Sequence, residues 1–172
     1  MSEQKTKPEK TKEFQEVEEL NLDAKVAVKS IANWETTFTR KVDGIGDVII
    51  APNGTMKFSR AEIIGQVQSG NKLFTGLDGA GSHATLYIDD KATRVEVEFE
   101  SEDGKITQKV YSDDKVKELF EIKSFESFKD KFTDAIKTRA EKRAVIETIK
   151  RLKLNDYAKI RFIENYTGFR IG

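Results

Sequence analysis

The sequence contains no cysteine. This absence excludes disulfide bonds, thiolate metal sites and a cysteine nucleophile, and it fits a chain made in a reducing compartment. Histidine occurs once, at position 83, so no HxH or HxxxH metal motif exists. The 30 basic and 30 acidic side chains cancel, so no net field draws the whole molecule to nucleic acid or to a membrane. Any electrostatic partner must therefore meet a local patch.

Long apolar runs are also missing. No stretch approaches the roughly 18 apolar residues that a transmembrane helix needs. The first twenty residues contain no apolar segment of the kind found in signal peptides. We therefore expect a protein that is neither secreted by a signal peptide nor membrane-spanning.

Residues 1–20 have little apolar surface. They hold ten charges and a proline, and their large apolar residues are Phe14, Val17 and Leu20. Such a segment cannot bury enough surface to offset the entropy of ordering it. The sequence predicts a disordered N-terminal arm over 1–20, and the alternative is a segment that orders on a partner.

The most organised stretch runs from residue 47 to 90. Residues 48–50 are β-branched, the Pro52-Asn53-Gly54 cluster predicts a turn, and alternating residues follow to Phe58. Ser59 and Glu62 have the spacing of a capping box, in which the carboxylate returns to the N–H of the cap residue. Gly70 is placed to end this helix.

Strands are expected on both sides of this stretch. Period-2 alternation predicts strands near Val26 and around Trp34 to Phe38, and a glycine-rich loop over 75–84 leads to a strand near residue 86. The run TRVEVEFE at 93–100 alternates strictly and predicts a strand with an acidic face. An Asp-Gly turn and a partner strand at 106–111 would complete a hairpin. We therefore expect residues 21–111 to form a β-rich domain, a small antiparallel sheet or sandwich with one embedded helix.

Beyond Tyr111 the apolar period changes to 3.6 residues. Residues 112–172 predict four helices, with Ser112, a Thr138–Glu141 capping box, and Asn155 or Asp156 as N-terminal caps. Gly168 is placed to end the last helix, and the last three helices are expected to pack as hairpins. The fold class is α+β, with a C-terminal helical unit.

The motifs that carry chemistry are weak. Gly76, Gly79 and Gly81 match no phosphate-binding pattern, and the loop leads into a strand rather than a helix. His83 near Asp78 and Asp89 makes a poor metal site, and Ser82 lacks a nucleophile elbow. We expect no enzymatic activity, cofactor, metal or small-molecule substrate.

Charge is segregated along the chain. Residues 136–172 hold ten basic and four acidic side chains, whereas residues 95–103 hold five acidic and no basic ones. Two interpretations remain for the basic helix. It is either a solvated face that docks on acidic groups or a helix-turn-helix-like element that contacts nucleic acid. The lack of aromatic residues interleaved with the charges argues against nucleic acid. The candidate interaction residues are Arg139, Lys142, Arg143, Lys150, Arg151 and Lys153 on the basic side, Glu96, Glu98 and Glu100 on the acidic side, and the apolar Phe169 and Ile171.

Three runs of the sequence carry a resemblance to a known group of proteins: IAPNGTMKFSRAEIIGQVQSGNKLFTG, GSHATLYIDD and RAEKRAVIETIKRLKLNDYAKIRFIENYTG. Through these runs, over about residues 25–168, the chain resembles small uncharacterised proteins of tailed bacteriophages that infect low-GC bacteria. It implies a virion or morphogenesis component and carries no site residues with it. We therefore expect a non-enzymatic structural or assembly protein in a virion or host cytoplasm. Its partners would be other virion or assembly proteins, including further copies of itself in an oligomer. The alternative is a nucleic-acid-binding or regulatory module that uses the helix at 139–153.

Overall fold

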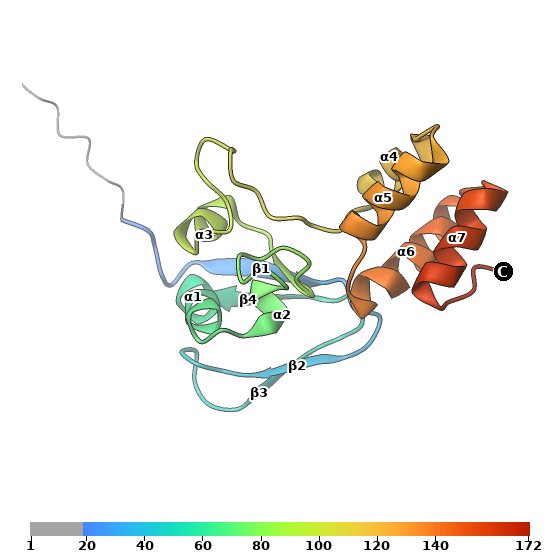
Figure 1. Ribbon diagram of the computed structural model, residues 1–172. Coiled ribbons are helices and arrows are strands. Elements are labelled where there is room, and N and C mark those ends of the chain that lie inside the picture. Colours follow the sequence, from blue (N-terminus) through green and yellow to red (C-terminus); the bar gives the residue numbers. More distant parts are fainter. Residues whose placement is uncertain (1–18) are drawn as a thin grey trace, which may run out of the picture.

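The computed structural model describes residues 19–172, so all but the end of the expected 1–20 arm lies outside the described residues. Those residues form five strands and seven helices (Figure 1). Three of the helices lie among or just after the strands, and the other four make up the C-terminal half. The α+β fold class is confirmed. Within residues 19–172, no helix is long and apolar enough to cross a bilayer.

Two antiparallel sheets make up the β half. In the first, β1 (Lys25–Ser30) lies between β4 (Thr55–Ser59) and β5 (Leu86–Ile88). In the second, β2 (Thr36–Thr39) pairs with β3 (Asp47–Ile50). Val28 stands opposite both Met56 and Ile88, so its side chain is buried at the centre of the first sheet. The alternation expected for these strands is confirmed, because successive residues of a strand point to opposite faces.

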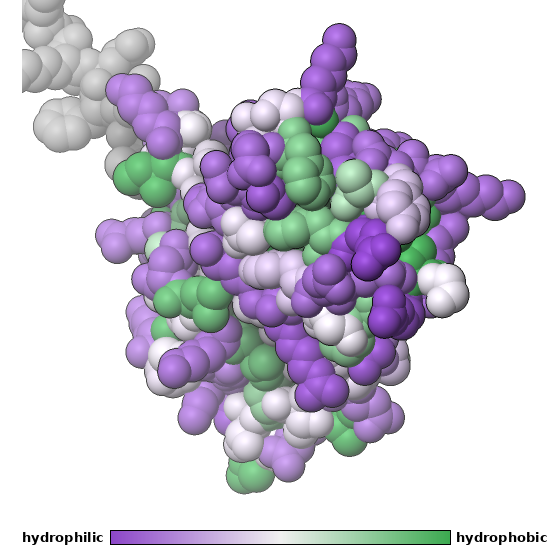
Figure 2. All heavy atoms as spheres, turned by 45° about the vertical axis from the view of Figure 1, so that its right-hand side comes forward, coloured by the Kyte–Doolittle hydropathy of each residue, from purple (hydrophilic) through white to green (hydrophobic). Residues whose placement is uncertain are grey.

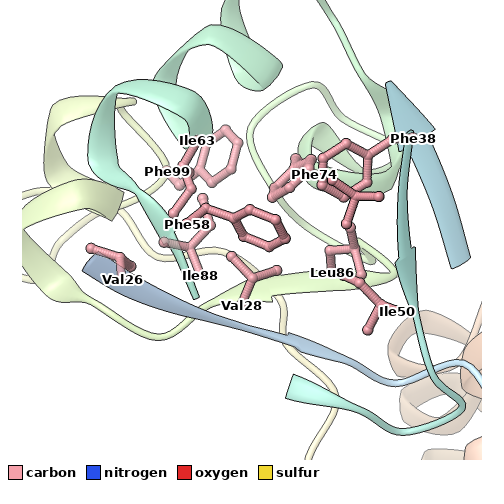
Figure 3. Packing of buried hydrophobic residues seen from close by; sticks show 11 residues of the cluster. Val26, Val28, Phe38, Ile50, Phe58, Ile63, Phe74, Leu86, Ile88 and Phe99 are labelled. Atoms are coloured by element: carbon pink, nitrogen blue, oxygen red, sulfur yellow. The ribbon is translucent and has the colours of Figure 1, made fainter. Parts of the chain in front are cut away.

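A core of apolar side chains fills the space between the two sheets. Phe38 comes from the two-stranded sheet, and its ring centroid lies 5.5 Å from that of Phe58 in β4 and 5.3 Å from that of Phe74. Figure 3 shows these rings directed toward one another, with Val28 and Leu86 beside them. Aromatic pairs at these distances add to the stabilisation from burial alone.

Helix α1 (Arg60–Gln68) begins where the sequence predicts. The Ser59 hydroxyl accepts a hydrogen bond from the Glu62 N–H at 3.0 Å. The second hydrogen bond of the expected capping box, from the Ser59 N–H to the Glu62 carboxylate, does not form. The Ser59 N–H donates instead to Asp43, and the buried Glu62 carboxylate accepts from the backbone N–H groups of residues 41–43. The carboxylate therefore holds the β2–β3 turn against the helix rather than closing its own cap.

The loop after α1 is a packing element. It contains the short helix α2 (Lys72–Thr75), and Gly81 in it has a φ of +85°. A Cβ at Gly81 would lie 2.5 Å from the Phe99 ring, so only glycine fits this position without movement. The loop thus closes the β core over Phe99.

The prediction of a strand at 93–100 is wrong, and so is the prediction of its hairpin partner at 106–111. Residues there form helix α3 (Lys91–Glu96) and irregular chain. Asp90 caps the helix by accepting from the Thr93 N–H at 2.9 Å, and Arg60 donates to the same carboxylate. This cap stabilises a helical turn that the alternating pattern does not reveal.

The C-terminal half contains the four expected helices, α4 (Asp113–Glu121), α5 (Phe125–Ala135), α6 (Arg139–Leu152) and α7 (Tyr157–Thr167). Ser112, Thr138 and Asp156 provide the caps, and Gly168 ends α7 with a φ of +75°. All four helices share a second apolar core, to which α4 contributes Val116 and Leu119. The helical half therefore has a hydrophobic core of its own.

Candidate interaction surface

One face of α6 carries a row of basic side chains. Arg139, Arg143 and Lys150 are separated by four and seven residues, which places them on the same side of a helix. The opposite side of α6 is buried in the helical core through Val145 and Ile149. Arg139 and Lys150, at the two ends of the row, are exposed, whereas Arg143 is half-buried and Ile146 on the same side of the helix is buried.

Aromatic rings lie against these cations. The Arg143 guanidinium is 3.8 Å from the centroid of Phe169, and the Lys142 ammonium is 4.6 Å from that of Tyr166. The Arg139 guanidinium is 5.8 Å from the Trp34 ring. No aromatic residue is interleaved with these basic residues in the sequence, but rings from other parts of the chain lie against them in the fold. Proximity along the sequence gave no signal of these contacts.

A shallow hollow of about 400 Å³ lies where the two halves of the molecule meet. Asn33 and Trp34, from the β1–β2 connection, form one side, and Arg139 and Arg143 form the other. Trp34 is 39% exposed. Among residues 19–172, neither arginine has a carboxylate within ion-pair distance. We call the set Trp34, Arg139, Lys142, Arg143, Lys150 and Lys153 the α6 surface.

Three other expected interaction residues are engaged elsewhere. Arg151 donates to Asp113 at 2.7 Å. Burial acts to raise the pKa of Asp113, but the hydrogen bonds from Arg151 and Thr148 outweigh it and lower that pKa. Phe169 and Ile171 are half-buried against the helical core rather than projecting from it. Arg151 and Ile171 therefore lie outside the α6 surface, and Phe169 contacts it through the Arg143 guanidinium.

The expected acidic ladder does not exist as a strand face. Glu96 ends α3, and Glu98 follows it with a φ of +64°. Glu100 accepts from Arg94 at 2.8 Å and lies 3.9 Å from the Lys91 ammonium. A carboxylate already paired within its own chain has less to gain from a second cation. The structure therefore provides no acidic strand face on which the basic helices of a second copy could dock.

The two halves are joined by a buried pair that sequence reasoning missed. His83 Nδ1 lies 2.9 Å from both carboxylate oxygens of Glu141, and both residues are buried. Because a carboxylate only accepts hydrogen bonds, Nδ1 carries the hydrogen. Glu141 also closes the predicted capping box with Thr138 at the start of α6. The pair fixes the first turn of α6 against the β half, which sets Arg139 beside Trp34.

His83 and Ser82 show no arrangement for catalysis. The Ser82 hydroxyl accepts from the Lys109 N–H at 2.8 Å, and the His83 ring is committed to Glu141. Among residues 19–172, no three His, Asp or Glu side chains gather as ligands for a metal. The serine and histidine thus connect segments of the fold.

The chain was compared with protein-family models, with curated proteins and with solved structures. None of the three comparisons found a match, so the α6 surface is interpreted from its own geometry.

Proposed function

We propose that the protein is a non-enzymatic assembly protein that docks on an acidic surface of a protein partner through the α6 surface. One observation carries the proposal: Arg139 and Arg143 border a hollow with exposed Trp34, and no carboxylate of residues 19–172 neutralises them. Arginine binds carboxylates with two parallel hydrogen bonds. Arginine and tryptophan are also the residues most enriched where truncation weakens protein interfaces.

The shape of the surface favours a macromolecule over a small ligand. The row from Arg139 to Lys150 spans eleven residues of helix, or about 16 Å at 1.5 Å per residue. The hollow at its end has only four lining residues and is widely open. A ligand of drug size would be poorly enclosed there, since most such ligands bury 70–90% of their surface. A partner's acidic face matches both the length and the openness.

The resemblance to bacteriophage proteins supplies a setting for this role. We propose a virion or morphogenesis component, with other virion or assembly proteins as its partners. The basic α6 surface on an otherwise neutral chain supports a role in assembly contacts, since complementary charges set the register and on-rate of docking. The wider molecule offers no broad apolar area in the view of Figure 2, where apolar patches are small and separated by hydrophilic side chains.

A second candidate is contact with single-stranded nucleic acid. Trp34 favours it, because an exposed ring beside arginines can stack on a base while the cations meet phosphates. The surface has one exposed ring of this kind, whereas Tyr166 and Phe169 are half-buried. A single stacking position is a short platform for a strand. We therefore rank this function second.

Photo-cross-linking tests the proposal. A photoreactive phenylalanine analogue at Lys150, on the exposed row, should give adducts with an acidic protein partner in lysates of cells or virions that contain the protein. The matched control places the analogue at Lys57, an exposed position of β4. Protein adducts that appear at both positions, or adducts at position 150 with nucleic acid alone, would refute docking on protein.

A further inference from the structure

A second concave site lies away from the α6 surface. It is a groove of about 560 Å³ between the chain at 107–111 and helices α4 and α5. Figure 1 shows this chain segment running extended toward α4. The apolar side chains that line the groove are Val110, Val116, Leu119, Ile122, Ala135 and Ile136. Its volume is in the range that holds a few side chains of a bound peptide.

One wall of the groove is an extended segment that is paired along one edge only. The Lys109 N–H donates to Ser82, and the Lys109 carbonyl accepts from the His83 N–H. Neighbouring residues of an extended chain direct their backbone groups to opposite edges. Those of Gln108 and Val110 accordingly point the other way, and they have no hydrogen-bond partner among residues 19–172. This free edge can accept a strand.

The rim of the groove is basic on balance. It carries Lys109, Lys115 and Lys131 against two carboxylates. Lys109 lies 2.7 Å from Asp134 and Lys115 lies 3.9 Å from Glu118, whereas Lys131 has no ion-pair partner within residues 19–172. An occupant should therefore combine apolar side chains with acidic ones.

The chain itself contains such a segment just before the described part begins. Residues 13–20 read EFQEVEEL, with four glutamates and no basic residue among Phe14, Val17 and Leu20. We propose that residues 13–18 of one copy bind in the 107–111/α4/α5 groove of a second copy. Phe14 and Val17 enter the apolar floor, and the glutamates face the lysines of the rim.

The connection to the fold favours a second copy over the same chain. Asn21 and Leu22 are fixed to the start of α1 through hydrogen bonds with Arg60 and Ala61. Figure 1 places that point at the opposite end of the molecule from α4 and α5. Phe14 precedes Glu19 by five residues, which span at most about 18 Å when fully extended. Exchange of this segment between copies is a self-association that does not involve the α6 surface.

Sedimentation equilibrium of the full-length chain tests the exchange. The parent protein should self-associate as its concentration rises. Phe14→Asp with Val17→Asp should weaken association by about 30-fold or more, as expected for loss of buried anchors. The control Thr6→Asp with Thr11→Asp adds the same charge outside the acidic segment and should leave association unchanged.

The groove is tested from its own side with a charge reversal. Lys131→Glu should weaken association by about twofold to fivefold, in keeping with an exposed ion pair. Lys123→Glu alters an exposed lysine that does not line the groove, and it should have no effect. Circular dichroism melting of each variant verifies that the fold is intact. A parent protein that stays monomeric at every concentration overturns the proposal, as does association that is indifferent to both Phe14→Asp/Val17→Asp and Lys131→Glu.

Discussion

At the scale of single residues, the buried His83–Glu141 pair contributes most to how the two halves of the molecule are joined. The two side chains lie 58 positions apart in the sequence and belong to different halves of the molecule. Glu141 accepts from Thr138 and Lys137 as well as from His83, so both of its carboxylate oxygens have hydrogen-bond partners. A buried charge that loses one partner is costly, because the remaining group stays desolvated.

We predict that His83→Asn destabilises the protein by about 3 kcal/mol. Asparagine tolerates the positive φ of 59° at this position, so the loss reports the side chain rather than backbone strain. Urea unfolding measures the change. The control Glu147→Gln removes an exposed carboxylate from the same helix and should shift stability by less than about 0.5 kcal/mol. Equal stabilities for His83→Asn and the parent would show that the pair does not hold the halves together.

Sequence reasoning had no means of finding this pair. His83 is a lone histidine, and the spacing of Glu141 from Thr138 identifies only the local cap, which is confirmed. The aromatic contacts of the α6 surface were missed for the same reason, since Trp34 and Arg139 are over a hundred residues apart. Pairing at such separation depends on how the elements pack, and residue periodicity does not encode it.

At the scale of elements, the turn between β2 and β3 depends on one carboxylate. Glu62 accepts from three consecutive backbone N–H groups, at 2.5 to 2.9 Å, and from the Gln66 side chain at 2.9 Å. Burial acts to raise the pKa of Glu62, but these hydrogen bonds outweigh it and lower that pKa. The ionised form is therefore stabilised by folding.

The sign of the pH dependence follows from that lowered pKa. A carboxylate with a lower pKa in the folded state adds stability above its unfolded pKa of about 4.3, and the contribution is lost as the pH falls through the folded value. Glu62→Gln should cost about 2–3 kcal/mol at pH 7. The difference from the parent should shrink below about pH 4. Urea unfolding across this range measures it, and a difference that stays constant with pH would contradict the role of the charge.

Periodicity identified most elements, but the two strands that it predicted at 93–100 and 106–111 do not form. The helices of the C-terminal half show a strong 3.6-residue repeat and clear caps, and all four are confirmed. The run at 93–100 alternates as strictly as β1 does, yet it begins with a helical turn capped by Asp90. A strand also needs a free edge to pair with and a core to face, and only Phe99 of this run is buried among its apolar residues.

At the scale of the whole molecule, two halves with separate apolar cores meet at a junction that borders one end of the α6 surface. One core lies among the sheets and the other among the four C-terminal helices. Trp34 is supplied by the first half, and Arg139 and Arg143 are supplied by the second. The hollow therefore exists only while the halves are docked, which links the His83–Glu141 pair to the proposed function.

Fluorescence of Trp34 tests the central claim most directly, because it is the only tryptophan in the chain and lies in the proposed site. Titration with poly-L-glutamate, as a simple acidic polypeptide, should change its emission, and added salt should weaken the binding. Arg139→Glu with Arg143→Glu should reduce the affinity by about tenfold or more, because it places two acidic groups against the probe. Lys57→Glu with Lys123→Glu makes the same change of net charge at exposed positions outside the surface and should have little effect.

The same titration with single-stranded oligothymidylate separates the two candidate functions. The account predicts that the oligonucleotide binds more weakly than poly-L-glutamate at equal salt. Emission of Trp34 that is unchanged by poly-L-glutamate would contradict docking on an acidic protein. Tighter binding of oligothymidylate, with a steep fall in affinity as salt rises, would also contradict it and would favour nucleic acid as the partner.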